Sequence, residues 1–210
     1  MALFAGKNLL CYRGERTVFA DLSFRCETGE ALVLRGPNGT GKSTLLRLMA
    51  GLLKAHEGRL SWEGEDITEE PEEHNARLHY VGHADAVKSV LNVKENIAFW
   101  AELRGPSVKL TEALDAFGIA YLADVPGRFL SAGQKRRVNL ARIIASPAKL
   151  WLLDEPTTAL DASAVADLQR EIARHRANGG MVIASTHAEI GLADANVLNM
   201  DAFQLRIDAA

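Results

Sequence analysis

The sequence has little cysteine, no long apolar run and no basic excess, and each absence excludes a class of function. Only two cysteines occur in 210 residues, Cys11 and Cys26, and their spacing matches no metal site. We expect both to be small buried packing residues without a redox role. The net charge of −3 argues against an extended nucleic-acid surface, which is normally basic.

Membrane-spanning and secreted classes are disfavoured on similar grounds. No apolar stretch reaches the roughly 18 to 20 residues that a membrane-spanning helix needs. Residues 1–10 lack the charged start and long apolar region of a signal peptide. We therefore expect a cytosolic chain, for which any membrane role requires other chains.

Residues 36–44 form the most informative motif of the chain. An apolar run precedes the motif and a helical run follows it, which is the setting that a phosphate-binding loop requires. Glycines let backbone N–H groups point at phosphate oxygens beside the positive end of a helix. The motif predicts that Lys42 reaches the β- and γ-phosphates and that the Ser43 hydroxyl binds Mg²⁺. The predicted nucleoside triphosphate site comprises Gly36, Pro37, Asn38, Gly39, Thr40, Gly41, Lys42, Ser43 and Thr44.

A second motif is the apolar run 150–153, which ends in Asp154 and Glu155. In phosphate-loop proteins, an aspartate at the end of such a strand helps to hold Mg²⁺, and this predicts a metal ligand at Asp154. Glu155 is expected to point at the γ-phosphate and to polarise the attacking water as a general base.

Apolar runs alternate with helical patterns along most of the chain, and this predicts an α/β fold with a mostly parallel sheet and helical cover. The first third is expected to form antiparallel strands, and the acidic stretch 63–73 a solvated loop. Strands are expected at 8–11, 22–26, 31–34, 59–62, 79–83, 150–154 and 181–185, with short ones near Val197 and Gln204. Helices are expected at 45–50, 93–104, 109–117, 132–145 and 162–177.

The segment Leu130-Ser131-Ala132-Gly133-Gln134 stands at a predicted helix start. It resembles the Leu-Ser-Gly-Gly-Gln signature of ATP-binding cassette (ABC) ATPases, with Ala132 in place of a glycine. A phosphate-loop kinase would leave this signature unexplained. The resemblance implies that Ser131, Gly133 and Gln134 contact ATP bound by a second copy, so that two chains sandwich the nucleotide. We expect alanine to be tolerated if φ is negative there, and the basic run 135–137 to lie on a solvated helix face.

The resemblance to ABC ATPases also implies roles for residues elsewhere. Asp161 matches the loop that crosses the dimer interface, and His187 matches the switch histidine that contacts the γ-phosphate. Tyr12 lies near the position of an aromatic that stacks on adenine, with a core or surface tyrosine as the alternative. His83 stands where the family usually carries glutamine, so its contact with Mg²⁺ stays open. The family implies one phosphate-loop NTPase domain over 1–210, with a core of 1–83 and 146–210 and a helical signature subdomain of 84–145.

Finer features resemble one ABC group, the ATP-binding subunits of the bacterial cytochrome c biogenesis system, also called haem exporter ATP-binding proteins. These features are segment 9–17, Tyr80-Val81-Gly82-His83, and the signature with the residues 135–138 after it. The resemblance implies an ATPase on the cytoplasmic face of the bacterial inner membrane, with integral membrane permease subunits as partners. No Cys-x-x-Cys-His motif occurs, so we expect no direct haem ligation. The alternatives are the ATPase of another small ABC exporter and a soluble ABC ATPase that does not transport.

Overall fold

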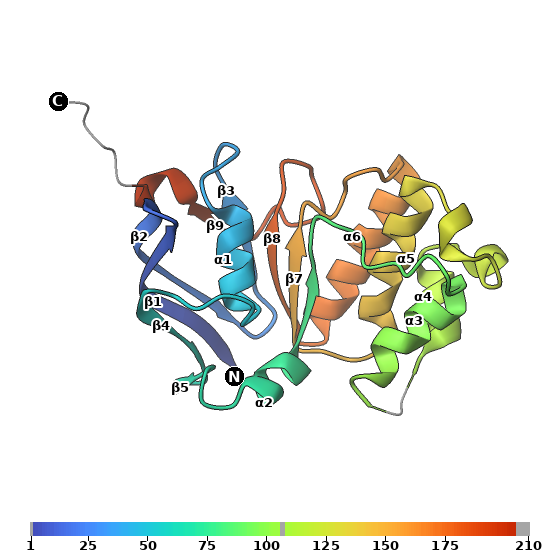
Figure 1. The fold of residues 1–210 in the computed structure, drawn as a ribbon, viewed down its shortest axis with the longest axis horizontal. Helices are drawn as coiled ribbons and strands as arrows, with labels where there is room; N and C mark the ends of the chain where they lie inside the picture. Colours follow the sequence, from blue (N-terminus) through green and yellow to red (C-terminus); the bar gives the residue numbers. More distant parts are fainter. Residues whose placement is uncertain (1, 106–107, 205–210) are drawn as a thin grey trace.

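Two sheets and a block of helices make up the computed structural model, which describes residues 2–105 and 108–204 (Figure 1). The antiparallel sheet has the strand order β2-β1-β4-β5, and the parallel sheet has the order β6-β7-β8-β3-β9. The first sheet contains β1 (Leu3–Arg13), β2 (Arg16–Glu27), β4 (Glu57–Trp62) and β5 (Glu65–Asp66). The second contains β3 (Ala31–Arg35), β6 (Leu78–Val81), β7 (Leu150–Asp154), β8 (Met181–Ser185) and β9 (Asn196–Asn199).

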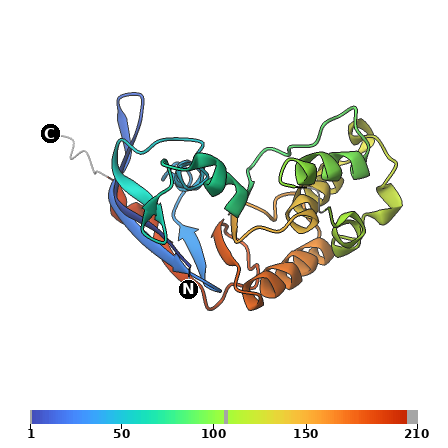
Figure 2. The same ribbon diagram turned by 90° about the horizontal axis from the view of Figure 1, so that it is seen from below.

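The strands β3, β7 and β8 of the parallel sheet are continuous apolar runs buried on both faces, and their alternate residues enter different cores. In β7, Leu150 and Leu152 join a core with helix α1 (Lys42–Met49) and the antiparallel sheet. Trp151 and Leu153 join a second core with the helices on the other side. Figure 2 shows α1 between the two sheets and α6 (Ala162–Ala177) along the opposite side of the parallel sheet.

Three α-helices lie in the described part of the segment 84–145, and we call this segment the helical block. It contains α3 (Val93–Glu102), α4 (Leu110–Ala116) and α5 (Ala132–Ala145), which pack against one another. Asn92 begins α3 with a reciprocal cap, because its side chain accepts from Glu95 N–H and the Glu95 carboxylate accepts from Asn92 N–H. No helix among the described residues is long and apolar enough to cross a membrane.

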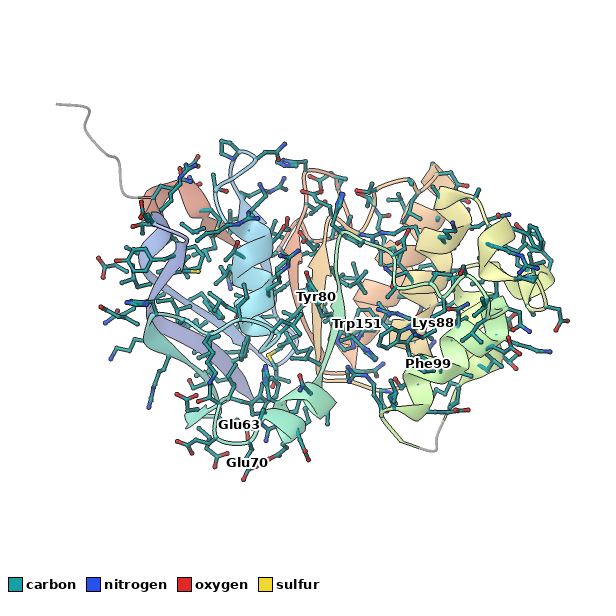
Figure 3. The ribbon with its side chains drawn as sticks, in the orientation of Figure 1. Glu63, Glu70, Tyr80, Lys88, Phe99 and Trp151 are labelled. Atoms are coloured by element: carbon teal, nitrogen blue, oxygen red, sulfur yellow. The ribbon has the colours of Figure 1, made fainter. Side chains whose placement is uncertain are left out.

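Two expectations for the chain's secondary structure are wrong. The acidic stretch is not all loop, because helix α2 (Pro71–Arg77) begins inside it. Proline in the first turn and two glutamates near the positive helix end favour this start. Figure 3 shows Glu63 and Glu70 on this outer edge. No strand forms at Gln204, which ends a short 3₁₀ helix (Met200–Phe203), whereas the predicted strand near Val197 is confirmed as β9.

Burial lowers the pKa of three described histidines, His74, His79 and His175, and the shift is largest for the last two. His79 is 7% exposed, and its Nε2 lies 2.9 Å from the Ser146 carbonyl oxygen. Burial lowers the pKa of His79 from 6.5 to about 3, and Arg104 and Arg142 add to this effect. Burial also lowers the pKa of His175, which stacks on Trp151 at 3.9 Å, from 6.5 to about 4.

We expect the free energy of unfolding to fall as the pH drops from 6.5 towards 5. In this window the unfolded chain binds protons at His79 and His175 and the folded chain does not, so acid favours unfolding by about 1.4 kcal/mol per pH unit for each histidine. Urea titrations between pH 7 and pH 5 measure this slope. His175→Gln should remove one histidine's share, whereas His56→Gln, at an exposed position, should leave the slope intact. An unchanged slope in His175→Gln would refute the assignment.

Candidate functional site

A cavity of about 640 Å³ lies at the carboxyl ends of the parallel strands, and we call it the phosphate-loop cavity. Ligands of open α/β sheets bind at this end of the strands. The lining comes from the β1–β2 hairpin, the loop after β3 and the ends of β6, β7 and β8. It consists of Arg13, Arg16, Thr17, Val18, Asn38, Gly39, Gly41, Lys42, Ser43, Thr44, His83, Asp154, Glu155, Thr158, Ser185, His187 and Gln204.

The loop 36–41 curls because three of its glycines adopt positive φ. Gly36, Gly39 and Gly41 have φ values of 140°, 87° and 94°, which disfavour any other residue. A Cβ atom on Gly41 would also lie 2.5 Å from the Val18 side chain. The Lys42 ammonium, on a residue 7% exposed, donates to the carbonyl oxygens of Gly36 at 2.6 Å and Pro37 at 2.9 Å. The loop therefore holds a buried cation at the N-terminus of α1.

Asp154 ends β7 with a carboxylate oxygen that lacks a hydrogen-bond partner among the described residues. The residue is 1% exposed, and its Oδ2 is buried and unpaired. Ser185, its partner in the register of β8, likewise has a buried hydroxyl without a partner. Burying such groups without compensation is costly, so the pair is suited to a bound polar ligand. Hard cations such as Mg²⁺ prefer oxygen ligands of this type, and Ser43 adds another hydroxyl to the same cavity.

Glu155 lines the cavity from an uncommon backbone conformation. Its φ is 45°, in the left-handed region that non-glycine residues rarely adopt. Its N–H donates to the Ser185 carbonyl at 2.8 Å. Its carboxylate Oε1 lies 3.7 Å from Nε2 of His187, so the predicted base and the predicted switch histidine are neighbours.

The signature residues lie outside this chain's own cavity. Ser131 caps α5, because its hydroxyl accepts from Gln134 N–H at 3.2 Å and the Gln134 side chain accepts from Ser131 N–H at 2.8 Å. Gly133 approaches the loop before α6 so closely that a Cβ would lie 2.9 Å from the Ala159 carbonyl oxygen. Ala132 lies in the first turn of α5 and has no positive φ, as expected.

Asp161 caps α6 and is likewise absent from the cavity lining. Its carboxylate accepts from Ala164 N–H at 2.9 Å and from Arg137 Nη2 at 2.7 Å. The hydrogen bonds from Ala164, Ser163 and Arg137 lower the pKa of Asp161 to about 2. In this chain the residue therefore joins the start of α6 to the signature helix α5.

The structure does not bring Tyr12 to the phosphate-loop cavity. Its ring is 44% exposed, packs edge-on against His56 at 4.9 Å and lines a separate hollow. The pairing of β1 with β2 shifts register between Cys11 and Tyr12, and this irregularity changes which side chains face the cavity. The neighbouring hairpin supplies the wall residues Arg13, Arg16, Thr17 and Val18, to which the sequence analysis assigned no role in the site.

Two further differences concern charged or polar positions. The basic run 135–137 is not wholly a solvated face, because Arg136 is only 2% exposed. The helical pattern alone did not indicate this burial. His83 is exposed and lines the cavity. In the sequence, this position stood out because the family usually carries glutamine there.

Comparisons with known proteins identify the family. The sequence model of the ABC transporter family matches residues 19–158. A Rhodospirillum rubrum protein named cytochrome c biogenesis ATP-binding export protein CcmA is 60% identical over 203 residues, which cover 96% of this chain and 87% of that protein. A Rhodopseudomonas palustris (strain BisB5) protein of the same name is 44% identical and covers 98% of both chains.

Solved structures give the same fold. A putative ABC transporter ATP-binding protein from Pyrococcus furiosus superposes with a TM-score of 0.82 at 25% identity, over 96% of this chain and 99% of that one. The chain is therefore an ATP-hydrolysing member of the ABC transporter family, within the group of the cytochrome c biogenesis ATP-binding export proteins.

Proposed function

We propose that this chain is the ATP-hydrolysing, energy-coupling subunit of a membrane transporter complex for c-type cytochrome biogenesis. It works on the cytoplasmic face of the bacterial inner membrane, beside integral membrane permease subunits. The name of the 60% identical relative supports the pathway. The observation that carries the activity is the arrangement of Asp154, Glu155 and His187 around the phosphate loop in one cavity.

We assign each of these residues a separate role in ATP hydrolysis. Ser43 and Asp154 would hold Mg²⁺, which would supply positive charge against the β- and γ-phosphates. The Lys42 ammonium leaves the loop carbonyls and donates to phosphate oxygens. The N–H groups of the loop bind the remaining phosphate oxygens. Glu155 takes a proton from the attacking water, and the neighbouring His187 contacts the γ-phosphate. The unpaired Oδ2 of Asp154 supports the metal assignment.

A second copy of the chain completes each site. Ser131, Gly133, Gln134 and Asp161 lie outside their own chain's cavity, as residues must if they serve the partner's ATP. Ser131 is exposed at the N-terminus of α5, where helix N–H groups favour an anion. The core of 1–83 and 146–210 binds the nucleotide, and the subdomain of 84–145 presents the signature.

The permease docks in a groove of about 440 Å³ between α1, the end of β6 and the helical block. Arg47, Arg104 and Arg142 line it, and no aspartate or glutamate of the described part of the chain does. Among the described residues, none of the three forms an ion pair with a carboxylate. Burial, with Arg104 adding, lowers the pKa of Arg142 to about 10. Acidic side chains of a partner would complement this groove, beside Tyr80 (Figure 3).

Recovery of the partner from native membranes tests the pathway and the groove together. A tagged chain, purified with ATP from gently solubilised membranes, should retain the cytochrome c maturation membrane subunits, as mass spectrometry can measure. Arg104→Glu should reduce this recovery at least about tenfold by placing like charges against the partner. The exposed Arg25 on β2 provides the control, and Arg25→Glu should retain the subunits.

Other outcomes of the same experiment contradict the proposal in separate ways. Recovery of an unrelated permease would keep the ATPase and replace the pathway. Recovery of ribosomal or DNA-associated proteins without a membrane subunit would remove the transport role. Equal recovery with Arg104→Glu would place the docking surface elsewhere.

A further inference from the structure

Arg136 is a buried cation whose five N–H groups are all matched by acceptors. A guanidinium carries five donors in a fixed planar arrangement. Nε donates to the Pro156 carbonyl at 3.1 Å, and Nη2 donates to those of Asp154 at 3.0 Å and Glu155 at 2.7 Å. Nη1 donates to the Gly82 carbonyl at 2.9 Å and to the Asp85 carboxylate at 3.3 Å.

These bonds hold the backbone around Glu155 in place. The left-handed conformation of Glu155 costs on the order of 1–3 kcal/mol and persists only where its surroundings hold it. The N–H of Glu155 donates to the Ser185 carbonyl, and its C=O accepts from Arg136 at 2.7 Å and, more weakly, from Thr158 N–H at 3.3 Å. The Arg136 side chain therefore helps to hold the peptide group that follows Glu155 in this conformation.

The same guanidinium reaches the segment after β6. Gly82 precedes His83, which lines both the phosphate-loop cavity and the groove. Asp85 also accepts from the amide of Asn139, a residue with 0% exposure one turn along α5. One side chain of the signature helix thus joins the loop after β7 to the start of the helical block.

We propose that Arg136 is a positioning residue for ATP hydrolysis, which holds Glu155 in its productive conformation and transmits displacement of α5 to it. The inference rests on the proposed role of Glu155 as the base. Arginine is suited to this place because neither lysine nor glutamine offers five donors in one plane. Lysine at this position keeps the positive charge but lacks the planar set of donors, and glutamine lacks both.

Steady-state kinetics of the full chain tests this proposal. In Arg136→Gln we expect kcat to fall about 10- to 100-fold while KM for ATP changes less than about threefold, because the base is misplaced and the phosphate loop is not. Arg136→Lys should lie between this variant and the wild type. Arg176, a guanidinium bonded to Asp194 and Gly29 far from the cavity, provides a matched control. Arg176→Gln should lower the melting temperature and leave kcat unchanged.

The double variant separates positioning from a general structural effect. If Arg136 acts through Glu155, adding Arg136→Gln to Glu155→Gln should cost less than about threefold in single-turnover hydrolysis of radiolabelled ATP. Losses that multiply in full would overturn the proposal, as would a folded Arg136→Gln protein with wild-type kcat. If that variant does not fold, the same comparisons are made with Arg136→Lys. A wild-type rate in Glu155→Gln alone would instead refute the proposed base.

Discussion

Glu155→Gln should lower kcat for ATP hydrolysis by about 10² to 10⁴, the usual contribution of a positioned general base. Glutamine has the shape of glutamate and cannot take a proton from water at neutral pH. The backbone bonds of this residue to Ser185 and Arg136 do not depend on the carboxylate, so the geometry of the cavity should survive. We therefore expect nearly unchanged ATP affinity and accumulation of an ATP-bound dimer.

Two measurements check this result. Steady-state phosphate release gives kcat, and size-exclusion chromatography with and without ATP and Mg²⁺ reports the dimer. Glu63→Gln, at an exposed turn on the outer edge, is the control and should behave as wild type (Figure 3). A Glu155→Gln protein whose kcat stays within about threefold of wild type would assign the base elsewhere.

Lys42→Ala should have the second largest effect, a loss of about 10² to 10³ in kcat together with weaker ATP binding. Cationic groups that stabilise the transferring phosphoryl group contribute this much when they are preorganised in a site that excludes water. Lys42 meets that condition, because it is 7% exposed and its ammonium is already held between two loop carbonyls. Alanine removes the only lysine in the lining of the cavity.

The two variants should differ in nucleotide affinity. Binding of a fluorescent ATP analogue should weaken about 10-fold or more in Lys42→Ala, as expected for the loss of a charged hydrogen bond, and stay nearly constant in Glu155→Gln. Lys54→Ala, at an exposed lysine beyond α1, controls for loss of charge. Equal affinities of wild type and Lys42→Ala would show that the ammonium does not reach the phosphates.

Sequence patterns predicted the elements that have strong local signals. The continuous apolar run of β7 and the capped helix α6 have the predicted bounds, because burial on two faces and an aspartate cap leave few alternatives. Helix α2 was missed because its stretch is acidic and has no apolar stripe. The face of Tyr12 depends on an irregularity in strand pairing, which period-2 alternation does not encode.

For the candidate site, the structure brings residues 38, 39 and 41–44 of the predicted phosphate loop into one cavity with Asp154, Glu155 and His187, whereas Gly36, Pro37 and Thr40 do not line it. The Arg136 cluster could not be predicted, because four of its five acceptors are backbone carbonyls up to 54 positions away along the chain, and any residue type provides a carbonyl. The exposed hairpin residues Arg13 and Arg16 also gave no signal, since surface arginines are common. What sequence patterns miss here is tertiary pairing between polar groups without a periodic pattern.

The strand order has a consequence for synthesis of the chain on the ribosome. β3, which leads into the phosphate loop, lies between β8 and β9, two of the last elements of the chain. The first 180 residues therefore hold the loop sequence without either hydrogen-bonded neighbour of its strand. Such distant pairing slows folding and exposes strand edges until it forms. A nascent or truncated chain would thus carry the ATP motif without a competent site, which defers ATP consumption until translation is almost complete.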